Sequence, residues 1–178
     1  NYGLNTDKLV LAKGLYTDVI TNDLGSDVIG ACSAETRVFP TESSVPAAVF
    51  NTAGEMEFSG VTVRSLAHGI MVSNLADVTM TDVRVVGGYS GLRIAGASVV
   101  ANDLFIANLT EDPSDPENTS IGVLVLGESS LVATGLHVEE CRDGIIVDGE
   151  EASIRVNHGH VQGVMFGVKV QGGTFRSD

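Results

Sequence analysis

The stretch Gly69-Ile70-Met71-Val72 recurs along the chain as a glycine followed by three residues that alternate between two faces. Its later copies are Gly91-Leu92-Arg93-Ile94, Gly122-Val123-Leu124-Val125, Gly144-Ile145-Ile146-Val147 and Gly167-Val168-Lys169-Val170. They follow one another at intervals of 22, 31, 22 and 23 residues. Removing nine residues from the second interval restores 22, so the chain contains one repeat of about 22 residues with an insertion in one copy.

Each copy of the repeat is joined by two further short segments, such as Val78-Thr79-Met80 and Val83-Arg84-Val85, with two residues between them. Apolar and polar residues that alternate with a period of two are typical of a half-buried β-strand. Three such strands cannot enclose a core alone, but they can when each turn of the chain lies on the turn before it. The sequence therefore predicts an all-β solenoid, a parallel β-helix of about 7 coils with three short strands in each.

Composition and charge exclude two classes of partner. The 178 residues contain only 10 Lys and Arg and have a net charge of −13, whereas binding to nucleic acid requires clustered basic side chains. The apolar residues are dispersed, and no run of them approaches the ~20 residues of a membrane helix. We therefore expect neither nucleic-acid binding nor membrane insertion.

The break between the second and third segments holds one polar residue in every repeat: Ser59, Thr81, Asn102, Thr134 and Asn157. This column resembles the polar ladder, often Asn, in the short turn of the pectin-lyase-like superfamily of right-handed parallel β-helices, so we interpret it as structural. The opening Leu9-Val10-Leu11-Ala12-Lys13-Gly14-Leu15-Tyr16 is similar to the start of bacterial extracellular β-helix repeat proteins of unassigned function. The resemblance implies that the β-helix is right-handed and that the protein is secreted by a bacterium or lies on its surface.

The repeat also divides the chain. We expect one β-helix domain over residues 1–178, with irregular first coils in 1–46, regular repeats in 47–178 and an inserted acidic loop at 109–120. The last repeat stops partway round a coil. Because solenoids normally have polar caps, we expect a segment of a larger protein or an end that a partner covers, and lateral or end-to-end self-association is compatible with this.

The resemblance implies that an enzyme of this superfamily would hold its substrate on the outer face of the first strand, with acidic residues, sometimes Ca²⁺, and an Arg or Lys base. In this chain the outward column of that strand consists of Val49, Met71, Arg93, Leu124, Ile146 and Lys169. It contains no carboxylate, although cleavage of a sugar chain requires a pair of them. We interpret the column as a contact strip for another chain or domain; cover by the chain's own loops and sugar binding are the alternatives.

Asp82 and Asp103 are the nearest approach to a carboxylate pair. They occupy equivalent positions of adjacent coils, about 5 Å apart, and Arg84 follows two residues after Asp82. Two like charges at this distance raise a pKa or recruit a cation, which makes these three residues candidates for catalysis. The alternative is a solvated turn in which Asp is favoured for its turn chemistry.

Two features are candidates for metal binding. His137 and His160 face outward on successive coils with His158 beside them, so they are candidates for a metal site or for proton transfer, and surface histidines are the alternative. The loop at 109–120 has four carboxylates that would suit Ca²⁺, but it lacks a regular Ca²⁺ motif, and a plain exposed loop is the alternative. We expect no other cofactor.

Cys32 and Cys141 are separated by about four coil rises of roughly 4.8 Å, too far for a disulfide, so two free thiols are predicted.

The sequence favours a rigid extracellular or cell-surface module with a structural or interaction role and no recognisable catalytic cluster. The alternative is a polysaccharide-active enzyme, such as a lyase, hydrolase or epimerase, or a carbohydrate-binding module. Its partner would be a polysaccharide or a protein.

Overall fold

The computed structural model describes all residues except 1–7, 23, 43–44 and 112–119. The described residues form strands and no helix, so none of them belongs to a helix long and apolar enough to cross a membrane. The strands are β1 (Lys8–Leu11), β2 (Gly14–Tyr16), β3 (Ile20–Asn22), β4 (Asp27–Gly30), β5 (Thr36–Val38), β6 (Ala48–Phe50), β7 (Gly54–Arg64), β8 (His68–Ser73), β9 (Ala76–Val86), β10 (Ser90–Ala95), β11 (Ser98–Ala107), β12 (Ile121–Leu126), β13 (Ser130–Glu139), β14 (Asp143–Asp148), β15 (Ser153–Asn157), β16 (His160–Gln162), β17 (Phe166–Gln171) and β18 (Thr174–Ser177).

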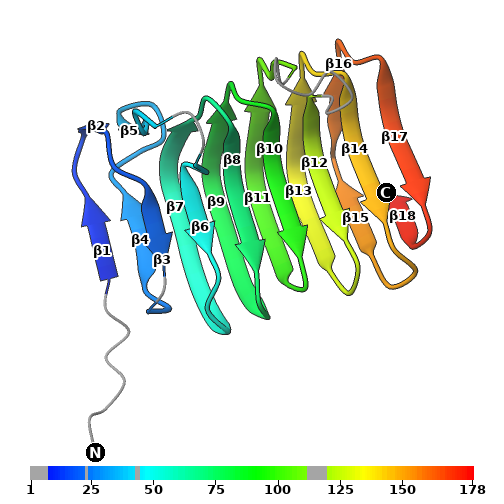
Figure 1. Cartoon of the computed structure of the whole chain (residues 1–178), viewed down its shortest axis with the longest axis horizontal. Helices are drawn as coiled ribbons and strands as arrows, with labels where there is room; N and C mark the ends of the chain where they lie inside the picture. The colour runs from blue at the N-terminus through cyan, green and yellow to red at the C-terminus, as the bar shows by residue number, and fades with distance from the viewer. Residues whose placement is uncertain (1–7, 23, 43–44, 112–119) are drawn as a thin grey trace, which may run out of the picture.

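The strands pair in parallel into two sheets, and each strand lies beside its equivalent in the next coil. The larger sheet follows the order β1-β4-β7-β9-β11-β13-β15-β18, with β2, β5 and β16 attached, and the smaller one follows β17-β14-β12-β10-β8-β6-β3. Figure 1 shows the coils stacked along the long axis. We number the coils 1 to 7, and each coil ends with a strand of the smaller sheet: β3, β6, β8, β10, β12, β14 and β17 in turn. Strand β7 thus belongs to coil 3 together with β8. The predicted parallel solenoid of about seven coils is confirmed.

The second and third predicted strands are continuous in coils 3 to 6, where they form the long strands β7, β9, β11 and β13. Each of these strands bends at a residue with positive φ, for example 51° at Asp82 and 70° at Gly135. We call these residues the turn column; its members are Gly60, Asp82, Asp103, Gly135 and His158. The expected two-residue break is therefore a bend within one strand, except in coil 7, where β15 and β16 are separate.

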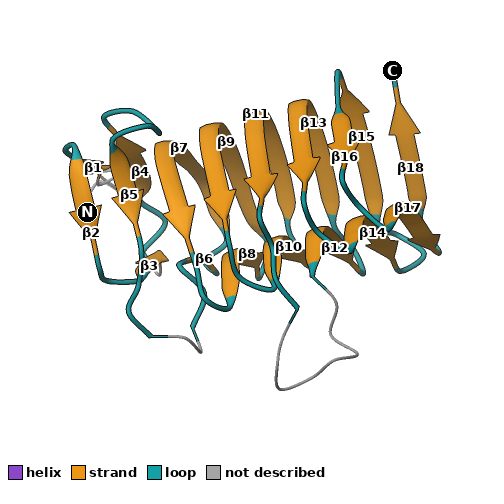
Figure 2. Ribbon diagram, turned by 90° about the horizontal axis from the view of Figure 1, so that it is seen from above, coloured by secondary structure: helices purple, strands orange, loops and turns teal. Residues whose placement is uncertain are grey.

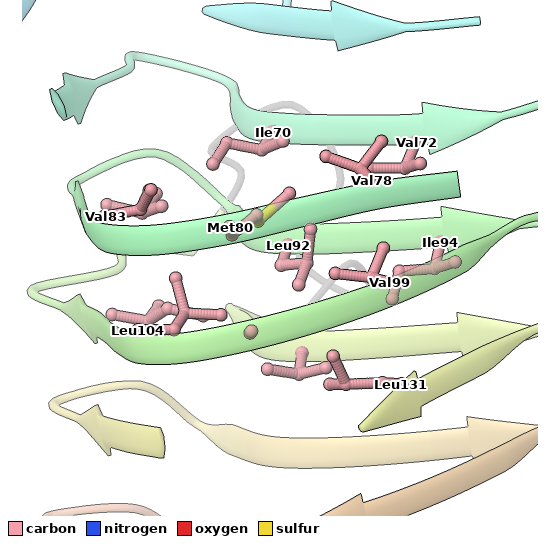
Figure 3. Packing of buried hydrophobic residues seen from close by; sticks show 14 of the residues in the cluster. Ile70, Val72, Val78, Met80, Val83, Leu92, Ile94, Val99, Leu104 and Leu131 are labelled. Carbon is pink, nitrogen blue, oxygen red and sulfur yellow. The ribbon is translucent and has the colours of Figure 1, made fainter. Parts of the chain in front are cut away.

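The core consists of ladders of inward side chains. Ile70, Leu92, Val123 and Ile145 occupy partner positions on β8, β10, β12 and β14, and each is at most 1% exposed. Figure 3 shows Ile70 and Leu92 pointing into the space between the sheets. The next rung, Val168 in coil 7, is 41% exposed because no further coil of the described structure lies on it. The alternating pattern of each strand thus removes the apolar side chains of one face from water.

Glycine occupies one corner position in coils 3 to 7, at Gly69, Gly91, Gly122, Gly144 and Gly167. We call these residues the glycine column, and none of them has a positive φ. A Cβ at Gly91 would lie 2.6 Å from the carbonyl oxygen of Gly122, and a Cβ at Gly122 would lie 2.5 Å from that of Gly144. The column is therefore glycine because adjacent coils approach too closely for a side chain.

Both cysteines are free, as the coil register predicts. Cys141 is buried, and loss of solvation raises the pKa of its thiol to about 11. Cys32 is half-buried, in the loop that joins β4 to β5.

Candidate functional site

The predicted contact strip lies on the outer face of the smaller sheet. Its six side chains, Val49, Met71, Arg93, Leu124, Ile146 and Lys169, are register partners on successive strands, and all are half-buried. At one end, Lys169 Nζ lies 2.5 Å from the buried Asp143 carboxylate and 4.2 Å from the centre of the Phe166 ring. At that end of the strip, the Lys169 side chain is therefore held by contacts within the chain.

Asp82 and Asp103 both belong to the turn column, but their carboxylates have different surroundings. Asp82 accepts hydrogen bonds from the Ser33 hydroxyl at 2.7 Å and from the Ser33 backbone N–H at 3.4 Å. Asp103 Oδ1 lies over Gly135, 2.6 Å from where a Cβ would stand. Asp is one of the few residues that adopt positive φ readily, which explains its presence at both positions without catalysis.

Arg84, the third catalytic candidate, begins a stack of planar side chains on the outer face of the larger sheet. Its guanidinium lies 4.6 Å from the centre of the Phe105 ring, and Phe105 stacks on His137 with ring centres 5.0 Å apart. These three residues line a shallow depression of about 250 Å³ together with Asp82 and Asp103. The structure thus brings the three catalytic candidates to one depression, beside an aromatic ring.

The stack continues through the two candidate histidines of the outer face. The rings of His137 and His160 lie 5.0 Å apart, and His137 Nε2 is 3.1 Å from Glu139 Oε2. The Gln162 amide donates to the same oxygen at 2.7 Å, and this bond, followed by the contact with His137, lowers the pKa of Glu139. His158 is an exposed member of the turn column. Within the described part of the chain no group of three or more His, Cys, Asp or Glu is placed to hold a metal ion.

A larger groove of about 540 Å³ joins this depression at Arg84. In it, the Arg64 guanidinium lies 5.0 Å from the centre of the Phe39 ring, and Arg37 donates to the Ala34 carbonyl. We call the groove and the depression together the arginine–aromatic groove. Its principal lining residues are Leu15, Arg37, Phe39, Thr62, Arg64, Arg84, Phe105 and His137. These residues come from β2, from β5 and the residue after it, and from β7, β9, β11 and β13, which Figure 2 shows side by side.

The groove gathers three of the chain's 10 basic side chains on one face of a protein with net charge −13. Arg37, Arg64 and Arg84 are exposed, and none of them lies within 4.0 Å of a carboxylate among the residues that the structure describes. The sequence interpretation missed this surface because β2 and β5 precede the regular repeat. Its one visible signal was the outward column Thr62, Arg84, Phe105, His137 and His160.

The predicted polar ladder, Ser59, Thr81, Asn102, Thr134 and Asn157, occupies register partners immediately before the turn column. Ser59 Oγ donates to Glu57 rather than to the next rung, at 2.9 Å. Over the described residues, no hydrogen bond joins one rung's side chain to another. The residue that takes the left-handed conformation is the one after each rung. Turn chemistry was the alternative for Asp82 and Asp103, but the column as a whole was not recognised from the sequence.

Comparison with known families assigns this architecture. A family model described as "Right handed beta helix region" matches residues 47–176, well over half of the chain. The chain belongs to the right-handed β-helix family. A search of curated proteins and a search of solved structures each returned no match. The family match and the parallel solenoid fit the resemblance to pectin-lyase-like right-handed β-helices.

The right-handed β-helix fold suits structural and carbohydrate-related roles. On this β-helix the outer face of the smaller sheet bears the contact strip, whereas the arginine–aromatic groove lies on the larger sheet. Residues 112–119 of the acidic loop lie outside the described residues, so Ca²⁺ binding by that loop stays a prediction.

Proposed function

We propose that this right-handed β-helix is a rigid, non-catalytic module that binds an extended acidic polysaccharide along the arginine–aromatic groove. The observation that carries the proposal is the row of three exposed guanidinium groups without a carboxylate partner among the described residues, interleaved with two aromatic rings on one face. A secreted or cell-surface location, which the resemblance implies, is where such a polymer would be met.

The side chains of the groove suit the carboxylate and hydroxyl groups of an acidic sugar. A guanidinium presents parallel N–H donors to a carboxylate, which makes Arg the preferred partner for planar acidic groups. The faces of the Phe105 ring contact Arg84 and His137, so the ligand meets the ring at its edge, whose positive charge attracts the hydroxyl oxygens of a sugar. Stacking of Arg84 on Phe105 and of Arg64 on Phe39 holds both kinds of group in place.

The groove is built mainly on strands, and this favours binding to an extended ligand. Arg64, Arg84, Phe105 and His137 lie on β7, β9, β11 and β13, whose backbones pair along their whole length. Arg84, Phe105 and His137 are register partners, so their spacing is set by the strand separation of about 4.8 Å, and Arg64 lies opposite Val86, two residues along from Arg84. A preformed row of contacts reduces the entropy that is lost on binding.

Cleavage of the polymer is less well supported than binding. Cleavage requires an acid and a base on either side of the scissile bond. The Asp82 carboxylate is hydrogen-bonded to Ser33, and the Asp103 carboxylate lies against Gly135. Both residues thus have a structural explanation, and we assign the groove to binding.

The proposal is tested by calorimetric titration with polymers of uronic acids and with a neutral glucan of similar length. We expect binding of the acidic polymers only, weakened by salt because the contacts are charged and exposed. Arg64→Gln and Arg84→Gln should each weaken binding about tenfold, since a hydrogen bond to a charged group is lost. Arg93→Gln removes a half-buried cation from the other face and should leave binding unchanged.

Two results would contradict the proposal. Equal affinity for the neutral glucan would show that the guanidinium groups do not select the ligand. Products that absorb in the ultraviolet would reveal lyase cleavage and contradict the assignment to binding alone.

A second candidate function is contact with a protein through the strip on the smaller sheet. It is favoured by four apolar side chains, Val49, Met71, Leu124 and Ile146, in one outward column. If copies of the chain associate laterally there, Leu124→Asp should lower the mass measured by light scattering at high concentration. A monomeric wild type would remove support for self-association.

A further inference from the structure

The loop between β4 and β5, residues 31–35, crosses two coils at the edge of the arginine–aromatic groove. It leaves coil 2 and passes over the turn column in coil 3, where the Cα of Cys32 is 3.6 Å from the Cβ position of Gly60. Its Ser33 then reaches coil 4, where the hydroxyl donates to Asp82 Oδ1 at 2.7 Å. The loop therefore connects coils that are not neighbours in the stack.

Side chains hold this loop at several points. The Thr62 hydroxyl of coil 3 donates to the Ser33 carbonyl at 2.5 Å, and Lys13 of coil 1 pairs with Glu35. The Thr36 hydroxyl accepts from the Ala31 backbone N–H at 3.1 Å. Ser33 itself is only 7% exposed. Among the described residues, the contact with Asp82 is the one that fixes the loop to coil 4.

The loop also orients a cation of the groove. Arg37 Nε and Nη2 both donate to the Ala34 carbonyl, at 3.3 and 3.2 Å. Ser33, Ala34 and Arg37 all line the groove. Because Ala34 follows Ser33 directly, the place of the carbonyl that holds Arg37 depends on the bond between Ser33 and Asp82.

We infer that Asp82 is a positioning residue, which fastens the loop 31–35 as a wall of the groove and thereby fixes Arg37 for an acidic group of the ligand. The inference rests on the proposed function for its ligand. Asp103, the next member of the turn column, has nearly the same φ, 58° against 51°, but among the described residues it makes no hydrogen bond to a loop on another coil. The positioning role therefore comes from the bond that the Asp82 carboxylate makes, and not from the positive φ that both residues share.

The first test measures the loop without any ligand. Asp82→Gly keeps a residue that accepts positive φ but removes the carboxylate, so the rate of Cys32 alkylation should rise at least about fivefold as the loop is released. Asp82→Asn retains an oxygen that accepts from Ser33 and should restore the wild-type rate. His158→Gly is the matched control in the turn column, and the buried Cys141 is the internal reference.

The second test measures affinity for a uronic-acid polymer. Asp82→Gly and Ser33→Ala should each weaken binding about tenfold, and Asp82→Asn should bind nearly as the wild type does. In the Arg37→Gln background, Asp82→Gly should weaken binding no further, because the two residues act through one contact. His158→Gly should bind normally.

The outcomes separate the inference from the proposed function. No binding by the wild type overturns the proposed function, and the alkylation rates then still decide whether Asp82 fastens the loop. Binding that Asp82→Gly leaves unchanged overturns the positioning role while the proposed function stands. Full additivity with Arg37→Gln, or an unaltered rate of Cys32 alkylation in Asp82→Gly, also overturns it.

Discussion

The glycine column and the turn column both repeat once per coil, yet different physical constraints select their residues. In the glycine column φ is not positive, and at every position except Gly167 a Cβ would collide with the next coil. In the turn column φ is positive at every position, and Asp and His occur beside Gly. The first column is limited by space and the second by backbone conformation, so identical substitutions should have different effects in the two.

The residue types in the turn column follow what lies against each position. Gly60 lies against the backbone carbonyl of Gly30 at the end of β4, and Gly135 lies under the carboxylate of Asp103, so a side chain would collide at both. Asp82 holds the loop through Ser33. The candidate site is thus formed where this column and an irregular loop meet, at the edge of a regular face.

The largest effect is expected for Gly91→Ala in the glycine column. The new methyl group would stand 2.6 Å from a backbone oxygen that cannot move without shifting coil 5, so we expect a loss of about 3 kcal/mol in the free energy of unfolding. Gly167→Ala is the matched control, since nothing lies within 4 Å of its Cβ position. Chemical denaturation of the two variants measures the difference, and equal stabilities would refute the steric explanation.

A smaller effect is expected for Gly135→Ala in the turn column. Alanine at a φ of 70° costs about 1.5 kcal/mol, and its methyl group would also displace the Asp103 carboxylate, which is the end of a movable side chain. Adding Asp103→Gly should recover the part that comes from the collision. If the double variant recovers nothing, the conformational term alone limits this position.

The smallest effect is expected at Asp103 itself. Asp103→Asn should preserve stability because Asn tolerates positive φ, whereas Asp103→Ala should lose about 0.5 kcal/mol relative to it. Thermal unfolding of both variants gives the comparison. An Ala variant at least as stable as the Asn variant would mean that backbone conformation does not determine this position.

The fold was predictable because one pattern repeats at nearly constant spacing. A one-residue error in register would place Ile70 or Leu92 outside, so alternation determines both the strands and their partners. The contact strip was placed on the correct face for the same reason. The bend within the long strands was less visible, although the sequence of Gly, Asp, Asp, Gly and His at one position is typical of residues that accept positive φ.

The arginine–aromatic groove was not predictable from the repeat. Arg37 and Phe39 belong to coil 2, whose loops interrupt the period, so their alignment with Arg84 depends on the path of the chain between β4 and β5. The bond from Ser33 to Asp82 spans 49 residues, and no local pattern specifies it. The repeat determines which strands pair, whereas this contact depends on a loop that does not follow the repeat.

The same bond has a consequence for how the solenoid unfolds. In an ideal stack each coil touches only its neighbours, so the coils can fray from an end one at a time. The Ser33–Asp82 bond adds a contact between coils 2 and 4, and the loop covers coil 3 on the way. Coils 2 to 4 should therefore open together, and their amide protons should exchange with one common free energy. Local unfolding at this end of the stack would then involve three coils at once.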